Sequence, residues 1–238
     1  MTKVIPYTSG MSNGYFVIGF GGAIAVDTGS VEGETTVLEL CEAAGLRPEE
    51  LRLLIITHGH VDHFYNLPAM KRVTGAPVLC HTAAGRYLRE GLLPDVTGRT
   101  DRGRAILAVQ DKEGPPLDHA PQIEPDILIN DVYDLDPWGV AGKLIPTPGH
   151  SDGCISVVLD NGAAIVGDLY AAPAGTNDGG MAFFTYPGGR FEEAQESLQR
   201  LLDMGVQIFY SGHGGPYSRK EVERALAEER EGAMPNKA

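Results

Sequence analysis

Hydrophobic residues recur along this chain with two different spacings, which together predict alternating strands and helices. Short, mainly apolar runs typical of buried strands occur at 15–18, 23–26, 51–56, 77–80, 127–129, 143–147, 154–159, 163–166 and 207–210. In segments 34–44 and 190–204, apolar side chains recur every three or four residues, which places them on one face of a helix. Gly45 and Gly205 follow these segments, and glycine favours the left-handed conformation that ends many helices.

Local signals define the ends of several shorter elements. Pro68 and Gly75 bracket a short helix, because proline suits the first helical turn and glycine suits the helix end. Thr82 is expected to cap the next helix. In segment 218–221, serine followed three residues later by glutamate forms a capping box and predicts the start of the last helix.

Charge and cysteine content narrow the classes of function. The chain has 32 acidic and 19 basic residues, and its net charge of −13 disfavours binding to nucleic acids. Cys41, Cys80 and Cys154 are widely spaced, so we expect reduced packing thiols, with Cys154 facing a β-core. Residues 1–10 contain no apolar segment typical of a signal peptide, and apolar runs reach only about six residues. We therefore expect a cytoplasmic protein without a membrane span.

A cluster of four ligand-type side chains stands within six residues. His58, His60, Asp62 and His63 directly follow the apolar segment 51–56. Residues two apart in an extended backbone point to the same side, so His58 and His60 face one direction. Zinc binds imidazole nitrogens and carboxylate oxygens at about 2.0–2.2 Å, which requires ligands to converge this closely. An isolated histidine is more often a surface or packed residue, whereas this cluster indicates metal binding.

More ligand-type residues follow downstream, each in a short polar loop after an apolar run. These loops are Thr147-Pro148-Gly149-His150-Ser151, Val166-Gly167-Asp168 and Ser211-Gly212-His213-Gly214. Together with the His-x-His-x-Asp-His string and segment 25–29, this series resembles the metallo-β-lactamase superfamily over nearly the whole chain. Asp27 in that early segment is either a hydrogen-bond partner of a metal-bound histidine or a turn-capping residue.

The resemblance implies an α/β (α+β) fold, namely an αββα four-layer sandwich with two mixed β-sheets and a metal site at one edge. The family pattern assigns the first metal to His58, His60 and His150. It assigns the second metal to Asp62, His63 and His213, with Asp168 bridging both. The expected cofactors are two divalent ions, with zinc first and iron or manganese as alternatives, because imidazole and carboxylate suit all three.

The resemblance also implies a reaction. A metal-bound hydroxide would cleave an ester, lactone or thioester of a small molecule, with Asp62 or Asp168 guiding the proton. In the lactonase branch, a tyrosine after the bridging aspartate helps to hold the substrate carbonyl. Tyr170 resembles that tyrosine, at an offset one residue shorter. The expected partner is a small-molecule substrate, with neither nucleic acid nor membrane, and a homodimer is left open.

Other branches of the family fit less well. True β-lactamases are exported and generally lack the bridging aspartate, and nucleic-acid-processing branches carry large extra domains or basic arms. Flavodiiron proteins replace the second motif histidine, here His60, with glutamate. Glyoxalase II appends a helical domain after the last histidine, whereas 25 residues follow His213. The alternative function is a mononuclear iron, persulfide dioxygenase-like oxidoreductase; a phosphodiesterase or a non-catalytic metal-binding module is less favoured.

Two stretches show neither the strand spacing nor the helix spacing of hydrophobic residues. They are expected to be irregular insertions in a single domain spanning residues 1–238. The first, at about 91–125, holds five prolines and is a candidate wall of the substrate pocket, with His119 solvated. The second, at about 171–189, is rich in glycine and alanine but carries several large side chains. Its aromatic residues are expected either to close over the metals as an apolar lid or to form a small satellite core. They are Phe183, Phe184 and Tyr186.

Overall fold

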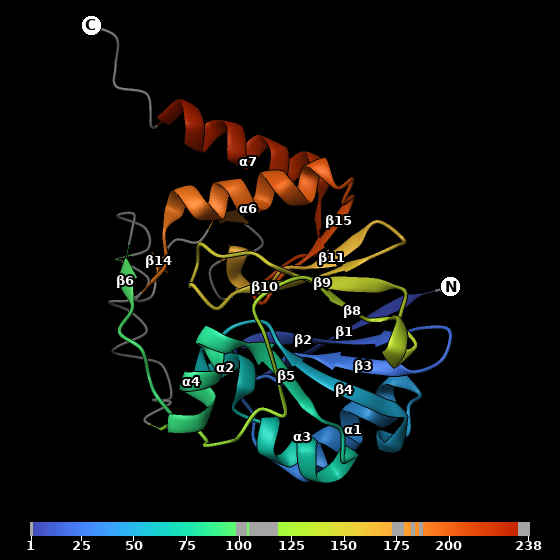
Figure 1. Cartoon of the computed structure of the whole chain (residues 1–238). Helices are drawn as coiled ribbons and strands as arrows, with labels where there is room; N and C mark the ends of the chain where they lie inside the picture. Colours follow the sequence, from blue (N-terminus) through green and yellow to red (C-terminus); the bar gives the residue numbers. More distant parts are fainter. Residues whose placement is uncertain are drawn as a thin grey trace, which may run out of the picture.

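The computed structural model describes residues 2–98, 104, 119–172, 179–181, 184–185 and 188–232. Within these residues, two six-stranded sheets pack face to face, and helices cover the outer face of each sheet (Figure 1). Each sheet contains both parallel and antiparallel neighbours. This arrangement is the αββα sandwich with two mixed sheets that the sequence led us to expect.

The first sheet contains the N-terminal strands and has the order β1-β2-β3-β4-β5-β7. Its strands are β1 (Lys3–Ser9), β2 (Ser12–Ile18), β3 (Ala23–Val26), β4 (Leu51–Ile56), β5 (Val78–His81) and β7 (Ile127–Ile129). The first three strands are antiparallel neighbours, whereas β3, β4, β5 and β7 run parallel. Parallel strands need crossover connections, and three helices provide them. These helices are α1 (Glu34–Ala44), α3 (Leu67–Thr74) and α4 (Thr82–Glu90).

The second sheet has the order β16-β15-β11-β10-β9-β8. Its strands are β8 (Tyr133–Asp134), β9 (Gly142–Pro146), β10 (Ile155–Leu159), β11 (Ala163–Ile165), β15 (Ile208–Tyr210) and β16 (Tyr217–Ser218). Only β11 and β15 pair in parallel within this sheet as described. Two long helices, α6 (Phe191–Asp203) and α7 (Arg219–Gly232), lie on its outer face (Figure 1).

Smaller elements complete the described structure. Three 3-10 turns are η1 (Pro48–Glu50), η2 (Asp136–Trp138) and η3 (Gly167–Leu169), and α2 (Val61–Phe64) is a single helical turn. Two short strand pairs are β12 (Tyr170–Ala171) with β13 (Gly180–Met181), and β6 (Thr97–Gly98) with β14 (Phe184–Thr185).

Three apolar layers hold the sandwich together, and β4 shows how the sequence encodes two of them. Successive side chains of a strand point to opposite faces. Leu53 and Ile55 therefore pack between the two sheets, whereas Leu54 and Ile56 pack under the helices of the first sheet. The third layer lies between the second sheet and helices α6 and α7. A strand buried on both faces reads as a continuous apolar run, which is the pattern of 53–56.

Most expected elements are confirmed within a residue or two, and two details differ. Strand β1 was not anticipated, because its sequence KVIPYTS mixes polar and apolar residues without a clean alternation. The cap of α4 is His81 rather than Thr82, because the His81 ring nitrogen Nδ1 accepts a hydrogen bond from the Ala83 amide at 3.2 Å. The aromatic side chains of the expected lid at 171–189 lie outside the described residues.

Strand direction determines where the candidate ligands meet. Strands β9, β11 and β15 all point the same way, because β10 is antiparallel to both β9 and β11, and β11 is parallel to β15. The loops that follow these strands carry His150, Asp168 and His213, and they therefore emerge at one edge of the second sheet. The loop after β4 faces them across the sandwich, and the Ile155 amide donates to the Thr57 carbonyl at 2.9 Å.

Candidate metal centre

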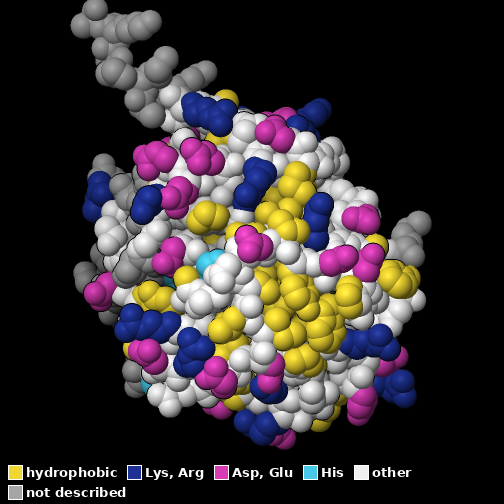
Figure 2. Space-filling model, in the orientation of Figure 1, with side chains coloured by type: hydrophobic (Ala, Val, Ile, Leu, Met, Phe, Trp, Pro, Cys, Tyr) yellow, Lys and Arg dark blue, Asp and Glu magenta, His cyan; other side chains and the backbone are white. Residues whose placement is uncertain are grey.

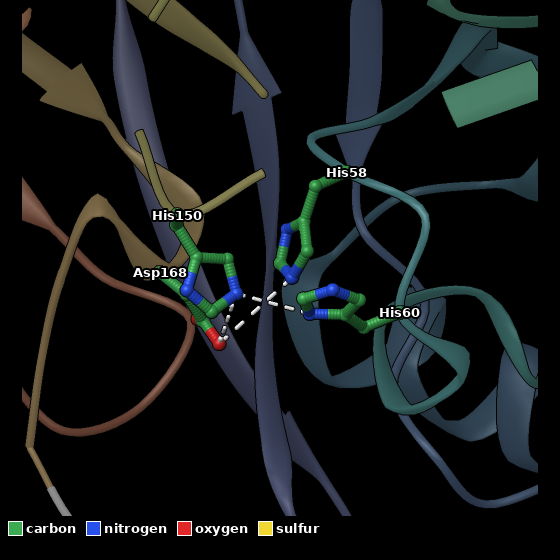
Figure 3. A group of neighbouring side chains, drawn as sticks. All are labelled: His58, His60, His150 and Asp168. Carbon is green, nitrogen blue, oxygen red and sulfur yellow. Dashed lines mark hydrogen bonds and ion pairs between the residues drawn. The ribbon is translucent and has the colours of Figure 1, made fainter. Parts of the chain in front are cut away.

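Four buried side chains converge where the two sheets meet, and they form the first ligand group. They are His58, His60, His150 and Asp168, and one ligand atom from each lies within 4.8 Å of the others (Figure 3). His150 Nε2 lies 3.0 Å from His60 Nδ1, and 3.7 Å from Asp168 Oδ2. His58 Nε2 lies 3.8 Å from the same carboxylate oxygen. Figure 3 shows the three rings and the carboxylate directed toward a common point.

A second ligand group lies beside the first and consists of Asp62, His63 and His213. His213 Nε2 lies 3.2 Å from Asp62 Oδ2, and His63 Nε2 lies 3.5 Å from that oxygen. Asp168 Oδ2 is also close to this group, at 3.3 Å from His213 Nε2 and 3.5 Å from His63 Nε2. One carboxylate oxygen of Asp168 therefore contacts ring nitrogens of both groups, as a bridging ligand would.

Hydrogen bonds to the far ring nitrogens fix which nitrogen of His58 and of His63 faces the cluster. Thr57 Oγ1 donates to Asp27 Oδ2 at 2.8 Å, because a carboxylate oxygen can only accept. The same Oγ1 is then free to accept from His58 Nδ1 at 2.9 Å. His63 Nδ1 donates to Asp27 Oδ2 at 2.9 Å. In the neutral form of both rings, the unprotonated Nε2 therefore faces the cluster, and this is the form that binds a metal.

Asp27 connects ligands of both groups and has a demanding backbone conformation. Its Oδ1 accepts from the Thr57 amide at 2.8 Å, and its own carbonyl accepts from the Tyr7 hydroxyl at 2.7 Å. Its φ of 57° lies in the left-handed region, which is strained for a residue with a Cβ. Of the two roles considered from the sequence, the structure supports that of hydrogen-bond partner to a candidate ligand.

Glycines leave the space that the ligands occupy. A Cβ added at Gly212 would overlap Asp168 Oδ1 and would lie 2.5 Å from His63 Cε1. A Cβ at Gly167, where φ is +53°, would lie 2.8 Å from Thr57 Oγ1. Any larger residue at these two positions would displace the carboxylate or the hydroxyl that orients His58.

The donor set fits divalent metal ions. His58 Nε2, His63 Nε2 and Asp168 Oδ1 are buried, and none of these atoms has a hydrogen-bond partner among the described residues. Buried polar atoms without partners are costly, and a bound cation would satisfy those that face the cluster. Imidazole nitrogens and carboxylate oxygens suit zinc, iron and manganese, so the residues present fit the expected group.

The two groups differ in the protonation of their histidines in the metal-free protein. Burial lowers the pKa of His58 and His60 well below the usual value and that of His150 to about 4, so these rings are neutral at pH 7. Burial also opposes charging of His63 and His213, but the adjacent carboxylates outweigh it. They raise the pKa of His63, and they raise the pKa of His213 to about 10. Protons thus occupy the second group where a cation would bind.

Three other residues singled out from the sequence, Tyr170, Cys154 and His119, lie outside the two ligand groups. Tyr170 is buried against Tyr217, and its hydroxyl donates to the Gly179 carbonyl at 3.1 Å. Cys154 is buried, but its thiol accepts from the Ser151 amide at 3.3 Å, one residue after His150, and the three apolar layers do not include it, so the expected position in a β-core is not confirmed. His119 is exposed, and its ring lies 3.1 Å from the Tyr65 hydroxyl.

Several contacts of the ligands were not anticipated from the sequence. Thr57 adjoins the motif, and its position directly before His58 was the only available signal. The Met11 carbonyl, which accepts from His213 Nδ1 at 2.9 Å, offers no sequence signal because every residue carries that group. Asn13, which contacts the loop of His213, is more than 190 positions away in the chain.

Comparisons with known proteins agree with this architecture. A metallo-β-lactamase fold-containing protein of Sulfurisphaera tokodaii is 29% identical over 181 residues, which cover 75% of this chain and 66% of that protein. A hydroxyacylglutathione hydrolase of Anaeromyxobacter dehalogenans is 28% identical over 223 residues, which cover 92% of this chain and 67% of that protein. The chain thus spans about two thirds of the length of these relatives.

Solved structures share the fold. A metallo-β-lactamase family protein of Thermus thermophilus superposes with a TM-score of 0.65 at 24% identity, covering 97% of this chain and 79% of that one. The structure of TTHA1623 in a di-iron-bound form gives a TM-score of 0.65 at 20% identity, covering 93% of this chain and 98% of that one. The sequence model of the metallo-beta-lactamase superfamily matches residues 7–213, a range that contains every candidate ligand. The chain therefore belongs to the metallo-β-lactamase superfamily.

Proposed function

We propose that this protein is a two-metal hydrolase that cleaves an ester, lactone or thioester of a small molecule. The observation that carries the proposal is the position of Asp168 Oδ2, within 3.3–3.8 Å of ring nitrogens from both ligand groups. His58, His60 and His150 would hold one ion, and Asp62, His63 and His213 would hold the other. Two such ions would lower the pKa of a water molecule and polarise the oxygen under attack.

The carboxylates of the site have the charge that proton transfer requires. Although burial opposes it, the neighbouring imidazoles hold the pKa of Asp62 and of Asp168 below the usual range. Both side chains are therefore ionised at neutral pH, which is the charge state that would bind a cation and accept a hydrogen bond from a nearby water molecule. The side chain of Asp62 is 16% exposed and lies at the rim, where it can pass the proton to solvent.

Tyr170 is proposed to help hold the substrate carbonyl. Its hydroxyl now donates to the Gly179 carbonyl, so that bond would have to open when substrate binds. Tyr170→Phe would then raise KM with little change in stability. An unchanged KM would assign the residue to packing against Tyr217 instead.

Relatives and surface charge support a small-molecule substrate. The relatives include proteins named as a hydroxyacylglutathione hydrolase and as a probable metallo-hydrolase of Bacillus subtilis, the latter 27% identical over 195 residues. On the face shown in Figure 2, acidic and basic side chains are interspersed, without a continuous basic stripe that would suit a polyanion. Within the described residues, no helix is long and apolar enough to cross a membrane.

The proposal is tested by metal analysis followed by an activity screen. Protein purified without added metal is analysed for bound ions, then loaded with zinc, manganese or iron, and assayed with lactones, thioesters, aryl esters, phosphodiesters and a persulfide. We expect about two ions per chain and hydrolysis of an acyl compound. Saturation at one iron, with oxygen consumed in the presence of a persulfide, would replace the hydrolase by the oxidoreductase alternative.

A further inference from the structure

The hairpin of β1 and β2 reaches the loop that carries His213. Thr8 pairs with Asn13 in the antiparallel register of this hairpin, next to its turn. From this position, Asn13 lies against residues 211–214, which connect β15 to the last strand of the second sheet. The hairpin belongs to the first sheet, so this contact joins the two sheets beside the second ligand group.

Asn13 makes three hydrogen bonds to the backbone on both sides of His213. Its side-chain Nδ2 donates to the Ser211 carbonyl at 3.1 Å and to the Gly214 carbonyl at 2.9 Å. Its backbone amide donates to the Gly212 carbonyl at 2.7 Å. Carbonyl oxygens can only accept, so the amide nitrogen must face them. Thr8 Oγ1 donates to Asn13 Oδ1 at 3.0 Å, which is consistent with this orientation.

The same hairpin also fixes the His213 ring. The Met11 carbonyl accepts from His213 Nδ1 at 2.9 Å, which directs Nε2 toward Asp62 and Asp168. The Tyr15 hydroxyl donates to the Ser211 carbonyl at 2.5 Å. Four consecutive residues of the His213 loop are thus each bonded to one hairpin.

The local sequence gives the loop little stiffness of its own. Gly212, Gly214 and Gly215 flank His213, and the last two have φ values of 73° and 78°. Glycine restricts the backbone least of all residues, so neighbouring contacts must hold such a loop. Packing contributes less here than at the other ligands, because the His213 side chain is 18% exposed whereas those of His58 and His63 are 0% exposed.

We propose that Asn13 is a positioning residue for the second metal ion, acting through the backbone on either side of His213. This inference rests on the proposed two-metal function. Its two amide hydrogens bind the carbonyls of Ser211 and Gly214 and keep His213 Nε2 in reach of an ion held by Asp62 and His63. His58, His60 and His150 lie on other loops, so we expect the first ion to depend much less on this contact.

The test is Asn13→Asp, which keeps the shape of the side chain and removes both amide donors. Metal-free protein is titrated with zinc and with cobalt by calorimetry and by competition with a chromophoric chelator. We expect the first ion to bind as in the wild type and the second ion to bind at least about tenfold more weakly, as found for partners of metal ligands. The melting temperature of the metal-free protein should change little. Asn13→Ala repeats the measurement without adding a charge and serves if the aspartate variant does not fold.

Asn161→Asp is the matched control. Its side-chain Nδ2 also donates to a backbone carbonyl, that of Thr2 at 3.2 Å, in an exposed turn between β10 and β11. This variant adds the same charge, and we expect it to bind both ions with wild-type affinity.

Two results would overturn the inference. Asn13 variants that bind both ions as tightly as the wild type would show that the contact does not position His213. Equal weakening of both ions, or a large fall in the melting temperature of the metal-free protein, would make Asn13 a residue of general structural importance. Neither result depends on activity. A wild type that binds two ions but hydrolyses no acyl compound would therefore refute the proposed function and leave the role of Asn13 untouched.

Discussion

The two ligand groups share Asp168 but are held in different ways. His58, His60 and His150 are at most 3% exposed, and they follow directly on strands that pack in the core. In the second group, the side chains of Asp62 and His213 are 16% and 18% exposed. Burial and the strands next to it hold the first group, with help from Thr57 beside His58, whereas hydrogen bonds from a distant hairpin hold the exposed part of the second group. A substitution outside the motifs can therefore weaken one site and spare the other.

The largest effect is expected from Asp168→Ala, which removes the oxygen shared by both groups. We expect the loss of at least one ion and a fall in kcat of at least about 1,000-fold, because the proposed activation of water requires both ions. Metal analysis and ester hydrolysis provide the measurement. Asp131→Ala, at an exposed position, is the control. Two tightly bound ions in Asp168→Ala would exclude a bridging role.

The second prediction uses pH to separate the two groups. In the metal-free protein, the raised pKa of His63 and the pKa of about 10 at His213 mean that both rings hold protons at pH 6–8. A metal must displace them, so affinity at the second group falls as pH falls, by about tenfold per pH unit for each proton displaced. With a pKa of about 4 at His150 and lowered values at its neighbours, affinity at the first group stays nearly flat over this range.

Competition titrations at pH 6, 7 and 8 measure both slopes. Equal slopes for the two ions would contradict the electrostatic difference between the groups. His213→Ala provides a further test. This variant should lose the ion whose affinity depends strongly on pH and keep the ion whose affinity is nearly independent of pH.

Thr57→Val should weaken the first group through a contact that the motif itself does not reveal. The change keeps the side-chain shape but removes the link between Asp27 and His58. We expect metal affinity at the first group to fall by about 10- to 100-fold and stability to fall by about 1–3 kcal/mol. Titration and thermal unfolding check these values, with the exposed Thr35→Val as control. If the second ion were the one lost, His58 would not depend on this link.

The smallest effect is expected from Cys154→Ser. The buried thiol already has partners, because Ser151 contributes its amide at 3.3 Å and its hydroxyl at 3.2 Å. A serine hydroxyl would inherit them, so we expect a cost of about 1 kcal/mol and unchanged metal content. In Cys41→Ser the new hydroxyl enters the apolar layer under α1, and we expect about 1–3 kcal/mol. Denaturant unfolding of the two variants compares them directly. A greater loss of stability in Cys154→Ser than in Cys41→Ser would be inconsistent with this account.

The sequence predicted the candidate ligands more fully than it predicted the residues that hold them in place. His58, His60, Asp62 and His63 are close in the chain, and strand direction brings the other three loops to the same edge. Asn13 bonds to residues 198 and 201 positions away, and single-sequence patterns do not encode such pairs. The roles of all seven candidate ligands and of Tyr170 stay predictions, which metal titration and the KM of Tyr170→Phe test respectively.

The two differences between the expected and the observed fold, strand β1 and the cap of α4, also have physical explanations. Strand β1 is an edge strand with polar residues on both faces, so its pairing with β2 supplies the order that periodicity does not show. At the start of α4, the chain follows His81 with Thr82, and both residue types can accept a bond from a helix N-terminus. The structure uses His81, because Thr82 directs its hydroxyl to the Ile129 carbonyl on the neighbouring strand.

Because the candidate ligand loops lie on both sheets, each bound ion would also link one sheet to the other. His58, His60, Asp62 and His63 follow a strand of the first sheet, whereas His150, Asp168 and His213 follow strands of the second. An ion held by both sets would join the two sheets at that edge. Free metal at about 100 times its dissociation constant would add about 2.7 kcal/mol per site to the free energy of unfolding. The melting temperature of this protein should therefore serve as a gauge of metal supply, even when no substrate is present.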